Sequence, residues 1–118
     1  MIKVVQELRE RDQAQTYVAT GQEHHRARFL WNELGFANYF DGIFYSAEIG
    51  FPKKDIRFFE AINRALEIKS GERPLFFDDQ PEIVELAERA GWDASTFTSV
   101  SDIQRHPRLR HLWPQPKT

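Results

Sequence analysis

The feature that most constrains this chain is a regular alternation of short apolar segments with amphipathic segments. Apolar runs at residues 16–20, 43–45 and 75–77, and a weaker one at 94–98, have the length and composition of buried strands. Between them, apolar residues recur at the i, i+3, i+4, i+7 spacing of a helix that is covered on one side. Strands and helices that alternate through short connections predict an α/β fold with a parallel sheet.

The expected helices have defined ends as well as apolar faces. Gly35 and Gly91 stand where a helix commonly ends. Asp55 and Ser101 stand where a capping side chain commonly begins a helix, and Pro81 suits a first turn. The expected apolar faces are Val4, Val5 and Leu8; Ala27, Leu30, Trp31 and Leu34; Ile56, Phe59, Ile62 and Leu66; and Ile83, Leu86, Ala87 and Ala90.

Length and composition exclude several classes of protein. The 118 residues contain no cysteine, which excludes disulfides, thiolate nucleophiles and cysteine zinc sites. The net charge of −2 gives no electrostatic reason to expect nucleic acid as a partner. No apolar run approaches the roughly 20 residues of a membrane-spanning helix, and the charged opening residues 1–12 do not resemble a secretory signal. We therefore expect a cytoplasmic protein with no membrane partner.

The length suits one small domain. We assign residues 1–105 to that domain and residues 106–118 to a peripheral tail, because the latter are rich in proline and basic residues. The basic run from Arg105 to His111 is interpreted as solvated. The pair His24 and His25 is interpreted as a surface feature at the start of a helix.

Polar residues follow two of the expected strands. Function in parallel sheets gathers at the carboxyl ends of the strands. Asp78 and Asp79 follow the third strand and are suited to hold Mg²⁺, although Asp79 is equally suited to cap the next helix. Thr20 and Gly21 follow the first strand and suit either a phosphate or a helix cap. Lys53 either neutralises a phosphate or is a solvated loop lysine.

The order of these features resembles the last three of the four sequence motifs of the haloacid dehalogenase-like (HAD) hydrolases. Residues 17–23 (YVATGQE) resemble the second motif, a strand that ends in Ser or Thr. Residues 46–55 (SAEIGFPKKD) resemble the third, which supplies a lysine. Residues 76–91 (FFDDQPEIVELAERAG) resemble the fourth, an apolar strand followed by an acidic pair and a helix. The resemblance covers roughly residues 1–105.

Three positions depart from the motifs of that family. Lys54 stands where proline is usual, Ile83 where Asn or Asp is frequent, and Gly21 in place of a common Asn. The last two changes remove polar side chains that would contact the metal and the phosphate.

The resemblance implies a three-layer, Rossmann-like parallel sheet flanked by helices, and Mg²⁺-dependent phosphatase chemistry through an aspartyl-phosphate. By analogy, Thr20 and Lys53 would be catalytic, and together with Gly21 they would bind the phosphate. Asp79, supported by Asp78, would ligate Mg²⁺. The partner implied is a small phosphorylated molecule.

The first motif of the family, an apolar strand followed by Asp-x-Asp that carries the nucleophile, does not occur in the sequence, and neither does a cap domain. Asp12 lies in a turn before the first strand and Asp41 follows the second motif, so neither has the right position. We therefore expect a HAD-type core that lacks its central first strand, binds Mg²⁺ weakly and is inactive alone. The two flanking strands would pair directly, a homodimer would fill the gap, or the chain would order only with the missing segment.

Three functions fit these residues. The chain is the carboxyl-terminal part of a phosphohydrolase core, a non-catalytic HAD-derived module for binding or dimerisation, or a receiver-type signalling domain. The motif order argues against the receiver, in which the acidic pair comes first and the lysine last. The sequence does not separate the other two functions.

Overall fold

The computed structural model describes residues 2–11 and 14–113, and helices alternate with strands over this span. The expected turn at Asp12 and the end of the expected tail, residues 114–118, lie outside the described residues. The elements are α1 (Ile2–Arg11), β1 (Tyr17–Thr20), α2 (His24–Arg28), η1 (Phe29–Glu33), η2 (Phe36–Asn38), β2 (Gly42–Tyr45), α3 (Ser46–Ile49), α4 (Ile56–Ala65), β3 (Leu75–Asp78), α5 (Pro81–Arg89), β4 (Asp93–Thr96), α6 (Val100–Gln104) and η3 (Arg110–Leu112). The α/β class predicted from the alternation is confirmed.

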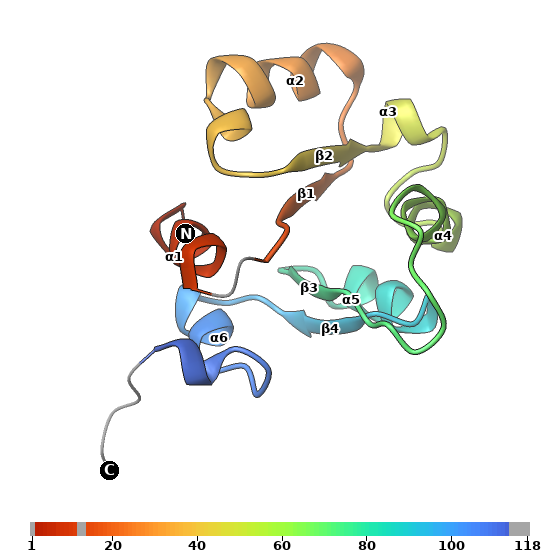
Figure 1. Ribbon diagram of the computed structural model, residues 1–118. Helices are drawn as coiled ribbons and strands as arrows, with labels where there is room; N and C mark the ends of the chain where they lie inside the picture. Colours follow the sequence, from red (N-terminus) through yellow and green to blue (C-terminus); the bar gives the residue numbers. More distant parts are fainter. Residues whose placement is uncertain (1, 12–13, 114–118) are drawn as a thin grey trace.

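The strands form two separate parallel pairs (Figure 1). β1 runs beside β2 with Thr20 opposite Tyr45, and β3 runs beside β4 with Asp78 opposite Thr96. Among the described residues, no strand ladder joins β1 to β3. Of the three outcomes expected for the flanking strands, direct pairing is therefore not the one that the structure shows.

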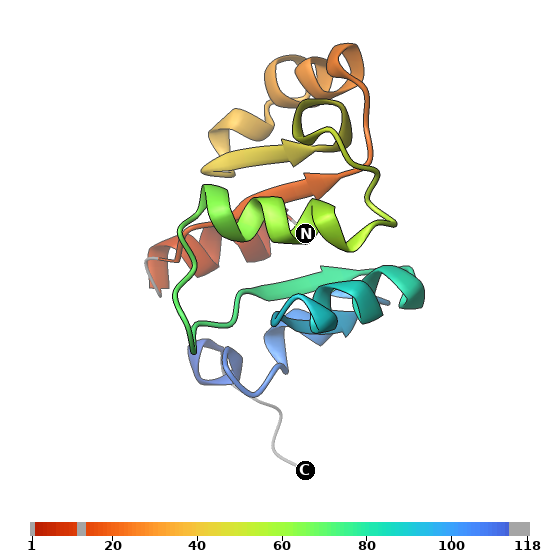
Figure 2. The same ribbon diagram turned by 90° about the vertical axis from the view of Figure 1, so that its right-hand side faces the viewer.

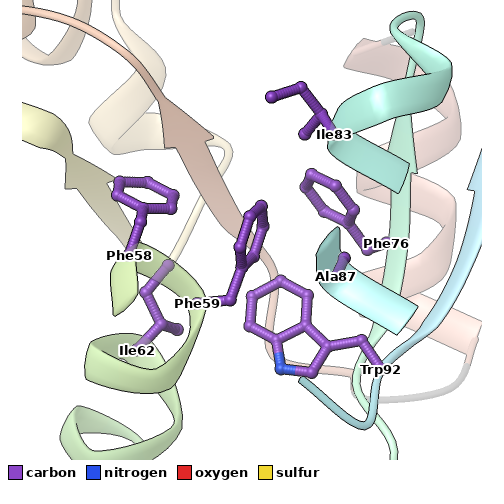
Figure 3. Packing of buried hydrophobic residues seen from close by; sticks show 7 residues of the cluster. All are labelled: Phe58, Phe59, Ile62, Phe76, Ile83, Ala87 and Trp92. Atoms are coloured by element: carbon purple, nitrogen blue, oxygen red, sulfur yellow. The ribbon is translucent and has the colours of Figure 1, made fainter. Parts of the chain in front are cut away.

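Helix α4 joins the two pairs in place of a strand ladder (Figure 2). Its Phe58, Phe59 and Ile62 are almost fully buried. Phe59 meets Phe76 of β3 and Trp92 edge to face, with ring centroids 5.6 and 5.1 Å apart (Figure 3). Full burial of one Phe side chain stabilises a fold by about 1.5–3 kcal/mol, so bridging through this helix offers the chain a strong alternative to direct pairing.

The aromatic cluster around α4 is shared by both strand pairs. Ala19 of β1 and Phe44 of β2 pack against it from one side, and Phe76 of β3 and Ala94 of β4 from the other. The cluster therefore fixes the position of β1 relative to β3 without a hydrogen bond between the two strands.

A second cluster covers the other face of β3. Val4 of α1 packs with Ile103, Leu109 and Trp113, and Leu75 and Phe77 of β3 lie against them. Leu109 and Trp113 are buried, so residues 106–113 pack onto the domain instead of forming a peripheral tail. The basic side chains of Arg105, Arg108, Arg110 and His111 are exposed, in line with the expected solvated run. The Arg108 Nη1 also donates to the carbonyl oxygen of Arg73 at 2.7 Å.

The second expected helix differs most from its prediction. After α2 the chain continues as a π-helix, η1, in which the amide of Leu34 donates to the carbonyl of Phe29 five residues earlier. Five-residue spacing breaks the 3.6-residue period, so Leu34 is 51% exposed and Trp31 is only half-buried. Gly35 then ends the segment with a left-handed φ of 75°, as the sequence predicts.

The expected capping residues are partly confirmed. Asp55 caps α4 by accepting from the amide of Arg57 at 2.9 Å. The cap of α6 is Ser99 rather than Ser101, because Ser99 and Asp102 form a reciprocal capping box that starts the helix earlier. No helix of the described residues is long and apolar enough to cross a membrane.

Candidate functional site

An ion pair connects the loop after α3 to the end of β3. The Lys53 Nζ lies 2.6 Å from the Asp78 Oδ2, and the two side chains are 21% and 8% exposed. The same ammonium lies 5.7 Å from the centroid of the Phe76 ring. Lys53 is therefore not a solvated loop lysine, because its side chain is mostly buried and its ammonium pairs with the carboxylate of Asp78.

The end of β1 lies beside this ion pair. A Cβ placed on Gly21 would stand 3.5 Å from the Cβ of Lys53, which is ordinary van der Waals contact. Gly21 and Lys53 are 32 positions apart in the sequence, and Lys53 and Asp78 are 25 apart. The fold thus brings together three of the five residues predicted for the site. Thr20 is half-buried at the end of β1.

The acidic pair is divided between two environments. Asp78 is buried, and its second carboxylate oxygen, Oδ1, accepts from the amide of Gln80 at 2.9 Å. Asp79 is exposed beyond the end of the strand. The cap of α5 is Gln80, so Asp79 is not the helix cap that its position also allowed. Asp78 is held rigidly, and Asp79 projects from the same strand end.

The backbone amides at the start of α2 already have a hydrogen-bond acceptor. Glu23 caps this helix, and its carboxylate accepts from the amides of His25 and Arg26 at 2.8 and 2.6 Å. These backbone hydrogen bonds lower the pKa of Glu23. Neither Thr20 nor Gly21 is therefore the cap, and a phosphate at this edge would meet Thr20, Gly21 and Lys53 rather than the amides of His25 and Arg26.

An open hollow adjoins the site on the side of β2. It has a volume of about 500 Å³ and is lined by Gly21, Gln22, Glu23, Ser46, Ala47, Gly50, Phe51 and Pro52. The Ser46 hydroxyl donates to the carbonyl oxygen of Gln22 at 3.1 Å, which ties the loop after β1 to the end of β2. Gly21 belongs both to the hollow and to the surroundings of Lys53, so the two are continuous.

Carboxylates are sparse around the ion pair. Over residues 2–11 and 14–113, no group of three or more His, Asp and Glu side chains is arranged to hold a metal ion. Asp78 and Asp79 provide the hard oxygen donors that Mg²⁺ prefers, but one of the two already pairs with Lys53. A metal at this position would need further oxygen ligands from water or from another segment.

A histidine and a tyrosine form a polar contact near the hollow. The Nδ1 of His24 lies 3.2 Å from the hydroxyl of Tyr45, and their rings meet edge to face. A hydrogen bond with Glu48 raises the pKa of the Tyr45 hydroxyl. His24 is thus partnered as well as exposed. No signal in the sequence pairs it with Tyr45, because the contact depends on the β1–β2 register.

Fold and site together define an α/β protein with a lysine–carboxylate pair at the carboxyl edge of parallel strands. A family model described as haloacid dehalogenase-like hydrolase matches residues 1–91 of the 118. The chain belongs to the haloacid dehalogenase-like hydrolases. This confirms the resemblance carried by the three sequence motifs. No curated protein matches this sequence.

Proposed function

We propose that this chain provides the phosphate-binding and Mg²⁺-binding part of a phosphatase-type hydrolase, and that a segment outside it supplies the nucleophilic Asp. The observation that carries the proposal is the 2.6 Å contact between Lys53 and Asp78, beside Gly21. The Lys53 side chain is only 21% exposed and is held in place by its carboxylate partner. Such a preorganised cation stabilises negative charge in a transition state better than a mobile one does.

Each residue of the site has a distinct part in this proposal. The Thr20 hydroxyl and the Gly21 backbone bind the phosphoryl oxygens. Lys53 neutralises their charge, and Asp78 holds the ammonium in position until the phosphate arrives. The side chains that bind phosphate and the hollow of about 500 Å³ beside them fit a small phosphorylated molecule. The chain then acts by positioning and by electrostatics.

The separation of the two strand pairs supports the proposed missing strand. β1 and β3 run in the same direction (Figure 2), and each has only one paired edge among the described residues. A parallel strand between them would unite both pairs into one sheet in the order β2, β1, added strand, β3, β4, with helices on both faces. The carboxyl end of that strand would reach the edge where Lys53 and Asp78 meet. An Asp there would be placed for attack on a bound phosphate.

Asp78 and Asp79 would hold Mg²⁺ in the complete site. A divalent cation there supplies charge neutralisation to the phosphoryl group. In the described part of the chain, Asp78 and Asp79 are the carboxylates at this strand end, and Lys53 already pairs with Asp78. We therefore expect weak Mg²⁺ binding by the chain alone and tighter binding once the added strand contributes a further carboxylate.

The proposal is tested by extending the chain at its amino terminus with an apolar strand that ends in Asp-x-Asp, joined through a flexible linker. The unmodified chain should not hydrolyse 4-nitrophenyl phosphate with Mg²⁺ above the buffer rate. The extended chain should hydrolyse it, and Lys53→Met or Asn at the first added Asp should abolish the activity. Saturable hydrolysis by the unmodified chain that requires Lys53 would contradict the proposal. Phosphate binding without turnover in the extended chain would instead favour the non-catalytic binding module.

A further inference from the structure

The segment made of α2, η1 and the following Leu34 carries the exposed large apolar side chains of the described residues. Phe29 is 38% exposed and Leu34 is 51% exposed. Both belong to one short segment, which lies at the outer end of the molecule above β2 (Figure 1). Single exposed apolar residues are common on protein surfaces, whereas exposed apolar residues grouped in one segment are typical of an interaction surface.

The part of the chain that carries this segment is thinly packed. Between residues 14 and 57, Ala27 is the one buried residue, whereas the first turns of α4 bury Phe58, Phe59 and Ile62. None of the residues of η1 is buried. The α2–η1 layer therefore has little core of its own, and it would gain stability from burial against a partner.

The charges along the segment identify the partner. Arg26 precedes Phe29 by three residues, and its guanidinium lies 5.2 Å from the centroid of the Phe29 ring. Glu33 follows Phe29 by four residues and is exposed. The two charges therefore lie on opposite sides of Phe29 along the segment, three and four residues away from it. The segment is thus basic on one side of an apolar centre and acidic on the other.

We propose that α2 and η1 form a twofold interface between two copies of this chain. When the segment is packed antiparallel on itself with Phe29 near the axis, Arg26 of each copy faces Glu33 of the other. Such a self-complementary patch is what a closed dimer requires. An anionic membrane would favour a uniformly basic face, and Glu33 beside Leu34 opposes it. Arg26, Phe29 and Glu33 do not line the hollow beside Lys53, so substitutions there leave the proposed hydrolase site intact.

The test is light scattering on the purified chain over a range of concentrations. Because the segment is short, we expect weak association, with a Kd of about 1 μM to 1 mM. Phe29→Glu should abolish the dimer. Arg26→Glu and Glu33→Arg should each weaken it about tenfold or more, and the double variant should recover much of the loss. Glu88→Arg makes the same charge change on the exposed face of α5 and should leave association unchanged.

Several results would overturn the proposal. A monomer at all concentrations would do so, as would a dimer insensitive to Phe29→Glu, which would indicate exchange of a strand instead. Equal loss of association in the single and double charge variants would show that Arg26 and Glu33 do not face each other. Binding of the chain to anionic vesicles with no self-association would assign the surface to a membrane. Far-UV circular dichroism of each variant distinguishes loss of association from loss of fold.

Discussion

Removal of Lys53 should destabilise the fold even though the residue lies at a candidate functional site. Lys53→Met keeps the length of the side chain but removes the charged partner of Asp78, whose side chain is 8% exposed. The amide of Gln80 is then the remaining hydrogen-bond donor to the Asp78 carboxylate. Loss of one partner from a buried ion pair costs about 3–5 kcal/mol. Because the Lys53 side chain is 21% exposed, water reaches the pair in part, and we expect the lower figure of about 2–3 kcal/mol.

A double-mutant cycle separates the ion pair from the rest of the site. Asp78→Asn retains a side-chain acceptor for Gln80 and allows Lys53 to turn towards water, so it should cost about 1 kcal/mol. The double variant should be less destabilised than the sum of the single variants, with a coupling energy of about 1–2 kcal/mol. Urea unfolding followed by tryptophan fluorescence measures all four proteins, since Trp92 is buried in the adjoining core. A coupling energy near zero would show that Lys53 and Asp78 do not pair in solution, and the account of the site would fail.

Two further predictions concern the core and the helix caps. Phe59→Ala removes a fully buried ring that contacts Phe76 and Trp92, and should lower the free energy of unfolding in urea by about 3–5 kcal/mol. Phe29→Ala, at a 38% exposed position, should lower it far less. Equal losses in the two variants would contradict the bridging role of α4. Hydrogen bonds from the amides of Thr98 and Ser99 hold the pKa of Asp102 below its ordinary value of 3.8, so its contribution to stability is present above that pH and is lost as the pH falls through the lowered pKa. Asp102→Asn should therefore be less stable than the wild type at pH 6, and the difference should shrink at acid pH; a difference that is constant with pH would refute this assignment.

The elements that local sequence predicts well are those whose cause is local. The apolar run before Asp78 gives β3, and Asp55 caps α4 through a hydrogen bond within two residues. The position of Lys53 relative to Asp78 was predictable only from the order of the three motifs, because the contact spans 25 residues. Once the motifs are recognised, the placement of Lys53 near the acidic pair follows.

The features that the sequence did not predict depend on contacts between distant segments. Burial of Trp113 requires α1, whose Glu7 accepts a hydrogen bond from the Trp113 indole N–H. A basic, proline-containing segment gives no local indication of that partner. The chain forms a π-helical turn at η1 and caps α2 with Glu23. Alternative local hydrogen bonds of similar strength compete with both features, and the spacing of apolar residues does not distinguish between them.

The separation of the two strand pairs also depends on contacts between distant segments, which local sequence does not predict. Open strand edges favour pairing, which is why direct closure of β1 onto β3 was one of the three expected outcomes. The sequence does not reveal that α4 carries enough buried aromatic surface to join the pairs without a ladder. Phe58 was not on the predicted apolar face of that helix, yet it is fully buried beside Phe59.

The proposed phosphate site is tested most directly by titration of the ¹⁵N-labelled chain with inorganic phosphate and Mg²⁺, followed by amide chemical shifts. The amides of Thr20 and Gly21 and those of Asp78 and Asp79 should shift together along one binding curve, and Lys53→Met should remove these shifts. Asp78 and Thr20 lie at the carboxyl ends of two strands that are not paired to each other, so a common response requires one shared site. Shifts confined to the basic segment from Arg105 to His111, or unchanged by Lys53→Met, would contradict the assignment of a phosphate site at this edge.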